Sequence, residues 1–280
     1  MHMAVSQTIA RRLKRPSRLA VVALTAVTTL AAAAATTHAE TITVCAEGCD
    51  FTSINAAIAA SADGDVIQLS AETYAENAVV NLAGKDIVLL GTVDSDGVPT
   101  SIIDGGGTHR VVESEAGMIT LENLVLQNGS AANGAGLDYT FGPITVRNCI
   151  FRDNAADDLG GAIHIENAGL TLADCVFTGN SAEEYAGAIY ANNAGVTITG
   201  SRFSGNSAEV VTCAEIRDGT LEMSDCTISQ HTDGETVLAL GASAAAVGLN
   251  TLTRCVFEDN NVEYYVVEAS NATDAMLARL

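Results

Sequence analysis

The sequence predicts an all-β chain wound into a parallel solenoid and closed at its N-terminal end by a short helix. The first observation is an internal repeat, because six similar segments start 25, 26, 26, 25 and 29 residues apart. The second is the alternation of apolar and polar residues inside each segment, which has the period of a β-strand. The third is a helical pattern ahead of the repeats. The six segments start at Ile119, Ile144, Leu170, Val196, Leu221 and Asn250.

Each segment contains a point where the alternation is interrupted. Ile144 and Val146 alternate before it, and Cys149 and Phe151 resume the alternation after it. Asn, Asp and Gly tolerate positive φ, so their presence at the interruption predicts a tight corner between two strands. Arg254 breaks the pattern after the longest spacing, and we expect that coil to be distorted. The corner residues are Asn123, Asn148, Asp174, Gly200, Asp225 and Arg254.

A second strip of residues recurs at the same period and predicts a further strand in each coil. Its copies start at Gly134, Gly160, Ala186, Cys213 and Val237. Each coil is therefore expected to consist of a strand, a tight corner, a second strand, a looser turn and a third strand, in that order. Hairpins would bring equivalent positions together only at every second strand, so the repeat predicts parallel strands that pair between coils about 4.8 Å apart.

Stacked coils predict ladders of similar side chains. One interior ladder contains Leu126, Phe151, Phe177, Phe203, Ile228 and Phe257, and another contains Leu124, Cys149, Cys175, Ser201, Cys226 and Cys255. A third, at a turn, contains Asn154, Asn180, Asn206 and Asn260. Stacked amides can satisfy turn carbonyls from one coil to the next.

The N-terminal part is predicted to cap the solenoid. The stretch from Thr52 has a Ser/Thr cap, Ile54 and Ile58 four residues apart and a Gly-Asp stop, which predicts a short amphipathic helix. It would cover the open edge of the first coil. We therefore expect one β-helix domain over 40–280, with the cap at 43–64, irregular coils at 65–118, regular repeats at 119–260 and a last coil or C-terminal cap at 261–280.

Residues 1–39 are predicted to be a signal peptide. Five basic residues precede an apolar run from Leu19 to Ala35, and Thr37-His38-Ala39 has the small-x-small pattern of a cleavage site. A membrane anchor is the alternative for this run. No second apolar run of spanning length follows, so we expect no membrane span after cleavage. The predicted location is secreted, extracellular or at the cell surface, with the periplasm as an alternative.

The chain is strongly acidic, with a formal charge of −21. The first 39 residues hold five of the 13 basic residues and none of the 34 acidic ones, so residues 40–280 carry −26. This charge argues against a nucleic-acid partner, since few cations are left to neutralise phosphates. It also favours a saline habitat, where salt screens self-repulsion. We expect a monomer.

Two stretches resemble known families. Residues 43–77 resemble the N-terminal cap and first coil of pectin-lyase-like right-handed parallel β-helix proteins. The Gly160-Gly-Ala-Ile and Ala186-Gly-Ala-Ile strips resemble the repeats of polymorphic outer-membrane (chlamydial type) proteins, as do the Phe-x-x-Asn steps that begin at Phe151, Phe177, Phe203 and Phe257. These resemblances imply a right-handed coil. The second also implies a surface protein, often adhesive.

A catalytic site has weak support in the sequence, and we assign no catalytic residue. β-Helix polysaccharide lyases use an Arg or Lys base, and none here stands in the Arg-x-Pro-x-x-Arg context of pectate lyases. Glycoside hydrolases need two nearby carboxylates, which the cluster Asp153, Asp157 and Asp158 could supply. The same three residues are the candidate Ca²⁺ ligands, and no other cofactor is expected. The candidate bases are Lys85, Arg110, Arg147, Arg152, Arg202, Arg217, Arg254 and Arg279.

Seven Cys in an exported protein leave at least one without a partner inside the chain. Cys45 and Cys49, on a short loop before the helix, are the predicted disulfide. The Cys residues of the interior ladder are expected to be small buried hydrophobes.

The predicted function is that of a secreted noncatalytic β-helix protein that presents a surface for adhesion or glycan binding. Its partner would be a polysaccharide or another cell-surface ligand. The alternative is a carbohydrate-active β-helix enzyme, either a polysaccharide lyase or a glycoside hydrolase.

Overall fold

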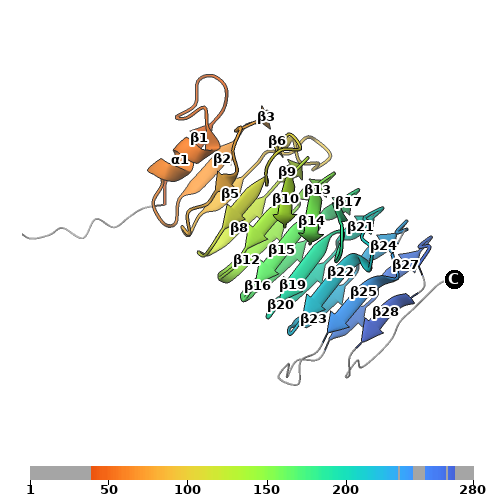
Figure 1. Ribbon diagram of the computed structural model, residues 1–280. Helices are drawn as coiled ribbons and strands as arrows, with labels where there is room; N and C mark the ends of the chain where they lie inside the picture. The colour runs from red at the N-terminus through yellow and green to blue at the C-terminus, as the bar shows by residue number, and fades with distance from the viewer. Residues whose placement is uncertain (1–38, 233, 242–249, 263, 269–280) are drawn as a thin grey trace, which may run out of the picture. The chain divides into compact units, whose positions relative to one another are not determined.

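The computed structural model describes residues 39–232, 234–241, 250–262 and 264–268, and residues 38–280 form one compact unit. The predicted signal peptide therefore lies almost wholly outside the described residues. In the described part the strands stack into three long parallel sheets around a common interior (Figure 1). The predicted all-β parallel solenoid with a helix near its N-terminus is confirmed.

The sheets are named here A, B and C in the order in which a coil visits them. Sheet A contains β1 (Thr41–Val44), β2 (Val66–Leu69), β5 (Val88–Leu90), β8 (Ile119–Glu122), β12 (Gly142–Arg147), β16 (Ala168–Ala173), β20 (Gly195–Thr199), β23 (Thr220–Ser224) and β26 (Thr251–Thr253). Sheet B contains β3 (Thr73–Tyr74), β6 (Ser101–Asp104), β9 (Leu124–Gln127), β13 (Ile150–Arg152), β17 (Val176–Thr178), β21 (Arg202–Ser204), β24 (Thr227–Ser229) and β27 (Val256–Glu258).

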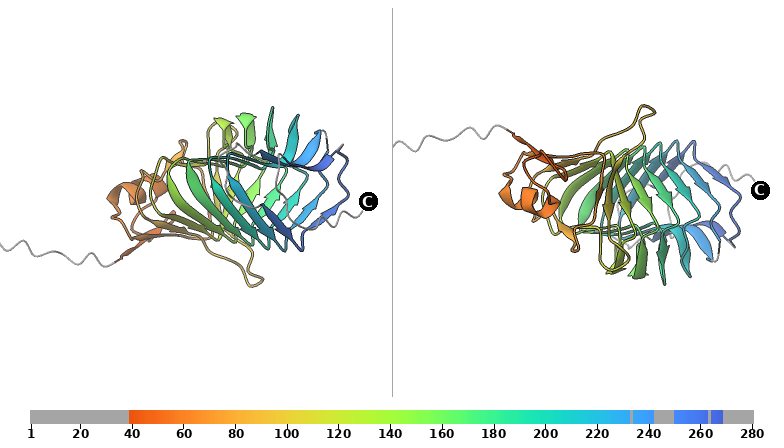
Figure 2. Two further views of the ribbon diagram at one scale, coloured as in Figure 1. Left: turned by 90° about the horizontal axis from the view of Figure 1, so that it is seen from below. Right: turned by 90° about the horizontal axis from the view of Figure 1, so that it is seen from above.

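Sheet C is formed by the second repeated strip. It contains β4 (Val80–Asn81), β7 (Val112–Ser114), β11 (Leu137–Tyr139), β15 (Ile163–Glu166), β19 (Ile189–Asn192), β22 (Val211–Arg217), β25 (Thr236–Gly241) and β28 (Tyr264–Glu268). A short fourth sheet projects between B and C and contains β10 (Ser130–Asn133), β14 (Ala155–Leu159) and β18 (Ser181–Ala182). Figure 2 shows the coils stacked along one axis.

The corner between sheets A and B has the predicted backbone. All six corner residues have φ between 45° and 62°, the left-handed region that Asn, Asp and Gly tolerate best. Arg254 makes the same bend, with φ 54°, so the corner of this coil is regular. The longer step into the coil runs through 242–249, which lie outside the described residues. The Arg254 guanidinium binds the carboxylate of Asp225, the corner residue one coil earlier. Stacking on the neighbouring coil, rather than the residue type, therefore determines the backbone conformation at this corner.

The connection that follows sheet B is longer than the corner, as expected: residues 153–162 separate β13 from β15, whereas only Asn148 and Cys149 separate β12 from β13. Its first residue is left-handed in each coil, with φ between 52° and 65°. The next residue belongs to the Asn ladder or replaces it, so the connection must hold its backbone in one conformation here. The left-handed residues are Asn128, Asp153, Gly179, Gly205, Gln230 and Asp259.

The interior consists of the predicted ladders. The rings of Phe151 and Phe177 stack at 5.0 Å between centroids, and those of Phe177 and Phe203 at 4.7 Å, nearly parallel in both cases. The Cys ladder beside them is buried as well. Nearly all the other buried apolar side chains join the same continuous core.

The Asn ladder is also present, with one substitution. The Asn154 amide donates to Asn180 Oδ1 at 2.9 Å, and Asn180 donates to Asn206 in the same way. His231 occupies the next place, and its backbone N–H donates to Asn260 Oδ1 at 3.0 Å. His231 Nδ1 contacts the Asn206 carbonyl, so Nδ1 carries the proton, and the buried Nε2 has no hydrogen-bond partner.

The capping helix α1 (Ile54–Ala60) is held by side chains from the coil that follows it. Ser53 is its N-cap, as predicted, but the helix ends at Ser61 rather than at the Gly-Asp pair. Glu76 accepts hydrogen bonds at the first turn, and Lys85 Nζ donates to the Ile58 carbonyl at 2.5 Å at the last. A carboxylate at the start and an ammonium at the end both complement the helix dipole.

The described residues contain no helix long and apolar enough to cross a membrane.

We expect Phe177→Ala to lower the free energy of unfolding by about 3–5 kcal/mol, since it removes a fully buried ring that stacks on both sides. Equilibrium denaturation measures the loss. Phe141→Ala is the matched control, because that ring is 55% exposed, and it should change stability by less than about 0.5 kcal/mol. Equal losses in the two variants would contradict the stacked ladder.

We expect His231→Asn to restore the Asn ladder and to reduce the loss of stability in acid. Burial lowers the pKa of His231 from 6.5, so below about pH 6.5 the unfolded chain takes up a proton that the folded chain resists. Wild-type stability therefore falls as the pH drops from 7 to 5, and the variant should lose less. Denaturation at both pH values tests this, with His109→Asn as the control. An unchanged pH dependence in H231N would count against it.

Candidate functional site

The outward face of sheet C carries a continuous ladder of polar side chains, named here the outer ladder. Neighbours along a strand point to opposite faces, so these residues point outward while the apolar residues beside them enter the core. Each member is paired in register with the next across the parallel strands. The outer ladder consists of Asn81, Glu113, Asp138, His164, Tyr190 and Glu215.

Arg110 holds the N-terminal half of the outer ladder together. Its guanidinium lies 2.8 Å from Glu113 Oε2 and 2.9 Å from Asp138 Oδ2. It also donates to the carbonyls of Asn133 and Gly134. With its donors used in this way, Arg110 acts as a clamp between two carboxylates and is not free to serve as a base.

His164 forms the middle of the outer ladder. Its Nδ1 lies 2.8 Å from Asp138 Oδ1, and its ring stacks on Tyr190 with 5.6 Å between centroids. Glu166 lies 3.9 Å from the other ring nitrogen. The imidazole is thus oriented by carboxylates on both sides.

The C-terminal half of the outer ladder contains a buried carboxylate. The Glu215 side chain is only 9% exposed, and its Oε1 accepts from Arg217 Nε at 2.6 Å. Its Oε2 is buried and has no hydrogen-bond partner, which is unusual for a polar atom in a folded protein. The Arg217 guanidinium lies over the rings of Tyr185 and Tyr190, at 4.7 and 5.5 Å from their centroids.

A polar hollow of about 250 Å³ opens over the first rungs of sheet C. A shallower hollow of about 520 Å³ adjoins it and shares Asn81 and Glu115. Phe141 follows the lining residue Thr140 directly and is 55% exposed. The smaller hollow is lined by Asn81, Arg110, Glu113, Ser114, Glu115, Asp138 and Thr140.

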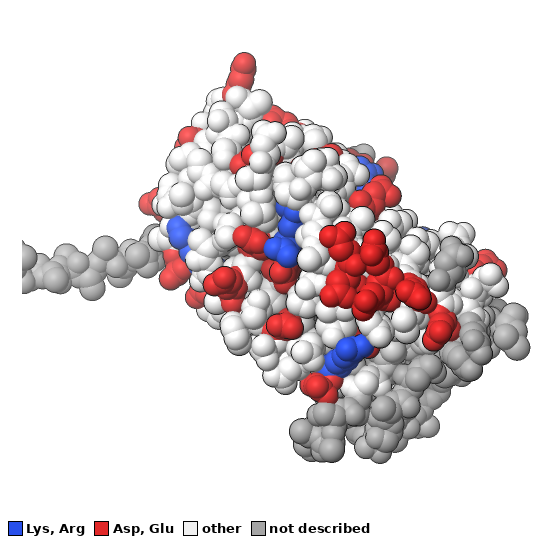
Figure 3. Space-filling view, in the orientation of Figure 1, with Lys and Arg blue, Asp and Glu red and all other residues white. Residues whose placement is uncertain are grey.

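A row of carboxylates, named here the acidic ridge, runs along the turns that lead into sheet C. Its members are Asp157, Asp158, Glu183, Glu184, Glu209 and Glu235, all exposed except the half-buried Asp158. Figure 3 shows a large acidic patch on this face of the solenoid. Two carboxylates about 5 Å apart in water repel each other by roughly 0.8 kcal/mol, so the repulsion between neighbouring carboxylates of the ridge is unfavourable to the folded state. Among the described residues, no basic side chain forms an ion pair with it.

The three predicted metal ligands are not brought together. Asp153 is the left-handed residue of the turn after β13. Asp157 and Asp158 are neighbours on β14, the first exposed and the second half-buried. Neighbours on a strand point to opposite faces, which separates their carboxylates. The described part of the chain contains no group of three or more His, Cys, Asp or Glu side chains placed to hold a metal ion.

Several of the candidate bases have structural partners. Lys85 caps α1, and Arg110 clamps the outer ladder. Arg152 donates to Gln127 Oε1 at 2.7 Å one coil away, and Arg254 binds Asp225. Arg279 lies outside the described residues. Lys85, Arg110, Arg152 and Arg254 therefore link successive parts of the solenoid.

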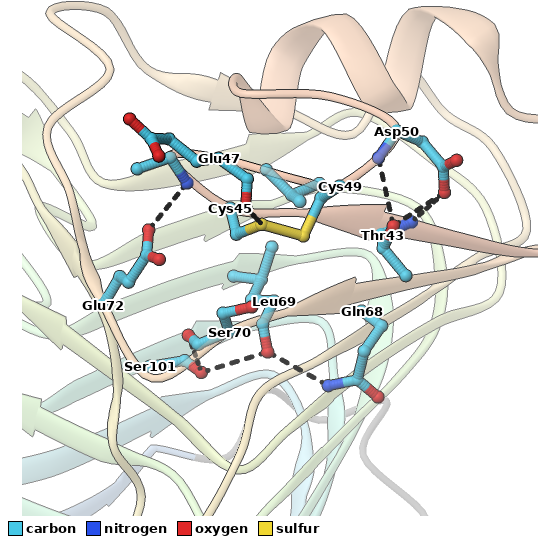
Figure 4. Close-up of a disulfide and its surroundings, with 12 residues drawn as sticks. Thr43, Cys45, Glu47, Cys49, Asp50, Gln68, Leu69, Ser70, Glu72 and Ser101 are labelled. Atoms are coloured by element: carbon cyan, nitrogen blue, oxygen red, sulfur yellow. Dashed lines mark hydrogen bonds between the residues drawn. A yellow bond between two sulfur atoms is a disulfide. The ribbon is translucent and has the colours of Figure 1, made fainter.

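Cys45 and Cys49 form a disulfide on the loop between β1 and α1, where the sequence analysis placed it (Figure 4). Asp50 closes the same loop by accepting from the backbone and hydroxyl of Thr43, and these hydrogen bonds lower its pKa. The other five Cys are free and buried. Burial raises the pKa of Cys175 to about 12.

The outer ladder was not predicted from the sequence, because the repeated positions that stand out there are the interior ones. A signal was present nonetheless. In the second strip a polar or aromatic residue stands between two apolar ones in successive coils, as Asp138, His164, Tyr190 and Glu215 do. Such alternation marks the outward face of a strand.

Comparison with known proteins establishes the family. The family described as "Right handed beta helix region" matches residues 36–203, so the chain belongs to it. Among solved structures, pectin methylesterase from Aspergillus niger is similar at a TM-score of 0.43 and 14% identity, covering 83% of this chain and 91% of that one. No curated protein sequence matches. The family match therefore indicates that the solenoid is right-handed.

We expect Cys149, Cys175 and Cys213 of the native protein to resist alkylation by iodoacetamide even at pH 9, because these thiols are buried and burial raises their pKa. Mass spectrometry should find no label on these three residues of the folded chain and five labels on the unfolded, unreduced chain. Reduction before unfolding should expose the two further thiols of Cys45 and Cys49. Labelling of either of these two without reduction would show that the disulfide is absent.

Proposed function

We propose that this β-helix protein binds glycans on the outward face of sheet C and does so without catalysis, as an exported surface protein. The polar hollow, whose lining residue Thr140 directly precedes Phe141, is the observation that carries the proposal. Its lining alternates hydrogen-bond donors and acceptors, with Asn81, Arg110 and Ser114 set among carboxylates. Sugar hydroxyls both donate and accept, so such a lining suits them.

Phe141 supplies the apolar part of the proposed site. A large exposed aromatic ring next to a polar hollow is a common platform for the C–H face of a sugar ring. At 55% exposure, Phe141 has surface left with which to contact a ligand. The similarity of the Phe-x-x-Asn repeats to polymorphic outer-membrane proteins supports a role in adhesion and stays a hypothesis.

The charge of the chain narrows the ligand class. Polyuronates are polyanions and would approach a domain of charge −26 against its field. Neutral polysaccharides meet no such barrier. We therefore place neutral glycans first for the hollow.

A second candidate function is carbohydrate catalysis, favoured by the contact between Asp138 and His164 at 2.8 Å. Glu113 and Asp138 flank the Arg110 guanidinium, and two carboxylates near a hollow can serve as acid and base. Release of reducing ends or of unsaturated sugars from a polysaccharide panel, with Asp138→Asn as the inactive control, would identify this function.

We expect Phe141→Ala to weaken binding of a neutral glycan by about 1 kcal/mol, or roughly fivefold, through loss of the stacking surface. A glycan array identifies the ligand, and titration calorimetry of the purified protein measures the change. Val256→Ala is the control, because this residue is 40% exposed on sheet B, away from the hollow. If the array shows no bound glycan, or if both variants lose affinity alike, the proposal fails.

A further inference from the structure

We propose that Cys226 and Cys255 form a redox-controlled disulfide that fastens the coil containing β27 to the coil before it. Both residues belong to the interior Cys ladder, and both thiols are free in the structure. The oxidant is a low-molecular-weight disulfide. The inference does not depend on the proposed glycan binding.

The register of sheet B places the two thiols in line. Thr227 on β24 is paired with Val256 on β27, so the residues directly before them, Cys226 and Cys255, stack on each other. The Val256 N–H donates to the Cys226 carbonyl at 2.8 Å, which holds the two backbones together. Stacked strands keep equivalent Cα atoms about 4.8 Å apart, and disulfides span Cα separations of roughly 4.4–6.8 Å. The backbone is therefore already spaced for a bond between the two sulfurs.

The two thiols also interact with each other. The Cys226 thiol donates to the Cys255 sulfur, and this hydrogen bond raises the pKa of Cys226 and lowers the pKa of Cys255. Each Sγ lies near the carbonyl two residues earlier, that of Ser224 at 3.2 Å and that of Thr253 at 3.6 Å, so the two side chains have the same orientation. Rotation of one side chain toward the other gives up only the weak hydrogen bonds of a thiol. Cys255 ionises first and is the nucleophile of the pair.

Access distinguishes this pair from a second stacked pair in the same ladder. Cys149 and Cys175 stack in the same way at the start of β13 and β17, but they are 0% and 1% exposed, and burial raises the pKa of both. Cys255 is 8% exposed, and β27 is the end strand of sheet B in the described part of the chain. Coils near an end open locally at a lower free energy than central ones. A small oxidant therefore reaches Cys255 more readily than the other pair.

The bond forms by two exchange steps in which atoms and electrons balance. The Cys255 thiolate attacks one sulfur of the small disulfide, forms a mixed disulfide and releases the other half as a thiolate. The Cys226 sulfur then attacks the Cys255 sulfur, forms the bond between the coils and releases the second half. The protons of the two protein thiols end on the two released small thiols. The protein thus loses two electrons, and the small disulfide gains them.

Oxidation of the folded protein with hydroxyethyl disulfide tests the pairing. The oxidised protein is then unfolded in iodoacetamide without reduction and digested with trypsin, which cleaves after Arg217 and Arg254 and so leaves Cys226 and Cys255 in different peptides. We expect two of the five labels to disappear and a linked pair of these two peptides to appear, which reduction separates.

The other thiols of the chain serve as internal controls. Cys149, Cys175 and Cys213 should keep their labels after the same treatment. The proposal is wrong if Cys226 and Cys255 both keep their labels, if Cys149 and Cys175 are oxidised as readily, or if Cys226 pairs with Cys213 instead.

Two matched variants test the fastening. Ser201 occupies the same ladder position, so Cys255→Ser and Cys149→Ser are changes that the ladder accommodates. Oxidation should raise the melting temperature of wild type and of Cys149→Ser by several degrees, because the bond closes a loop of the unfolded chain, and it should leave Cys255→Ser unchanged. An equal rise in both variants would overturn the inference. The labelling of the wild-type protein decides the pairing even if a variant does not fold.

Hydrogen exchange locates the effect along the solenoid. In the oxidised protein the amides of β27 should exchange roughly tenfold more slowly than in the reduced protein, since the bond suppresses local opening of that coil. The amides of β13 should exchange at the same rate in both forms. Unchanged exchange at β27 in a protein that carries the bond would show that the disulfide does not fasten the coil.

Discussion

Every part of this structure depends on one constraint, the in-register stacking of parallel strands about 4.8 Å apart. Each side chain must lie against its own counterpart in the coils before and after it. Phe rings meet this requirement by stacking flat, and Asn amides meet it by donating to the next amide while accepting from the previous one. The left-handed corners obey it as well, since even Arg254 adopts the conformation of its neighbours.

The same constraint is unfavourable for charge, and the two outward surfaces respond to it differently. In the outer ladder, Arg110 lies between the carboxylates of Glu113 and Asp138, and Arg217 pairs with Glu215, so that each carboxylate has a cationic neighbour. In the acidic ridge, like charges follow one another with no described counter-ion. The ion pairs of the outer ladder therefore relieve the repulsion that stacking imposes on like charges, and the described residues offer the acidic ridge no such relief.

The sequence predicted the interior better than the surface for a physical reason. Burial restricts residue type, so Phe177 and Asn180 recur visibly and their ladders could be aligned by eye. The left-handed position in the turn after sheet B was not predicted, because it accepts Asn, Asp, Gly and Gln alike. The hollow and the contacts of Arg217 with Glu215, Tyr185 and Tyr190 could not be predicted, because they depend on which outward side chains face each other across coils. The sequence also could not show how the three Asp residues of the expected Ca²⁺ site lie, since two of them are neighbours on one strand.

The contacts that hold α1 also bear on the order of folding. The helix is fixed at one end by Glu76 and at the other by Lys85, both of which come from the coil that follows it. A ribosome delivers the N-terminus first, so the end of the solenoid can close once residue 85 has emerged, before any regular repeat has been made. The nascent chain would then possess a finished template, and each later coil would need only to add to an edge that already exists.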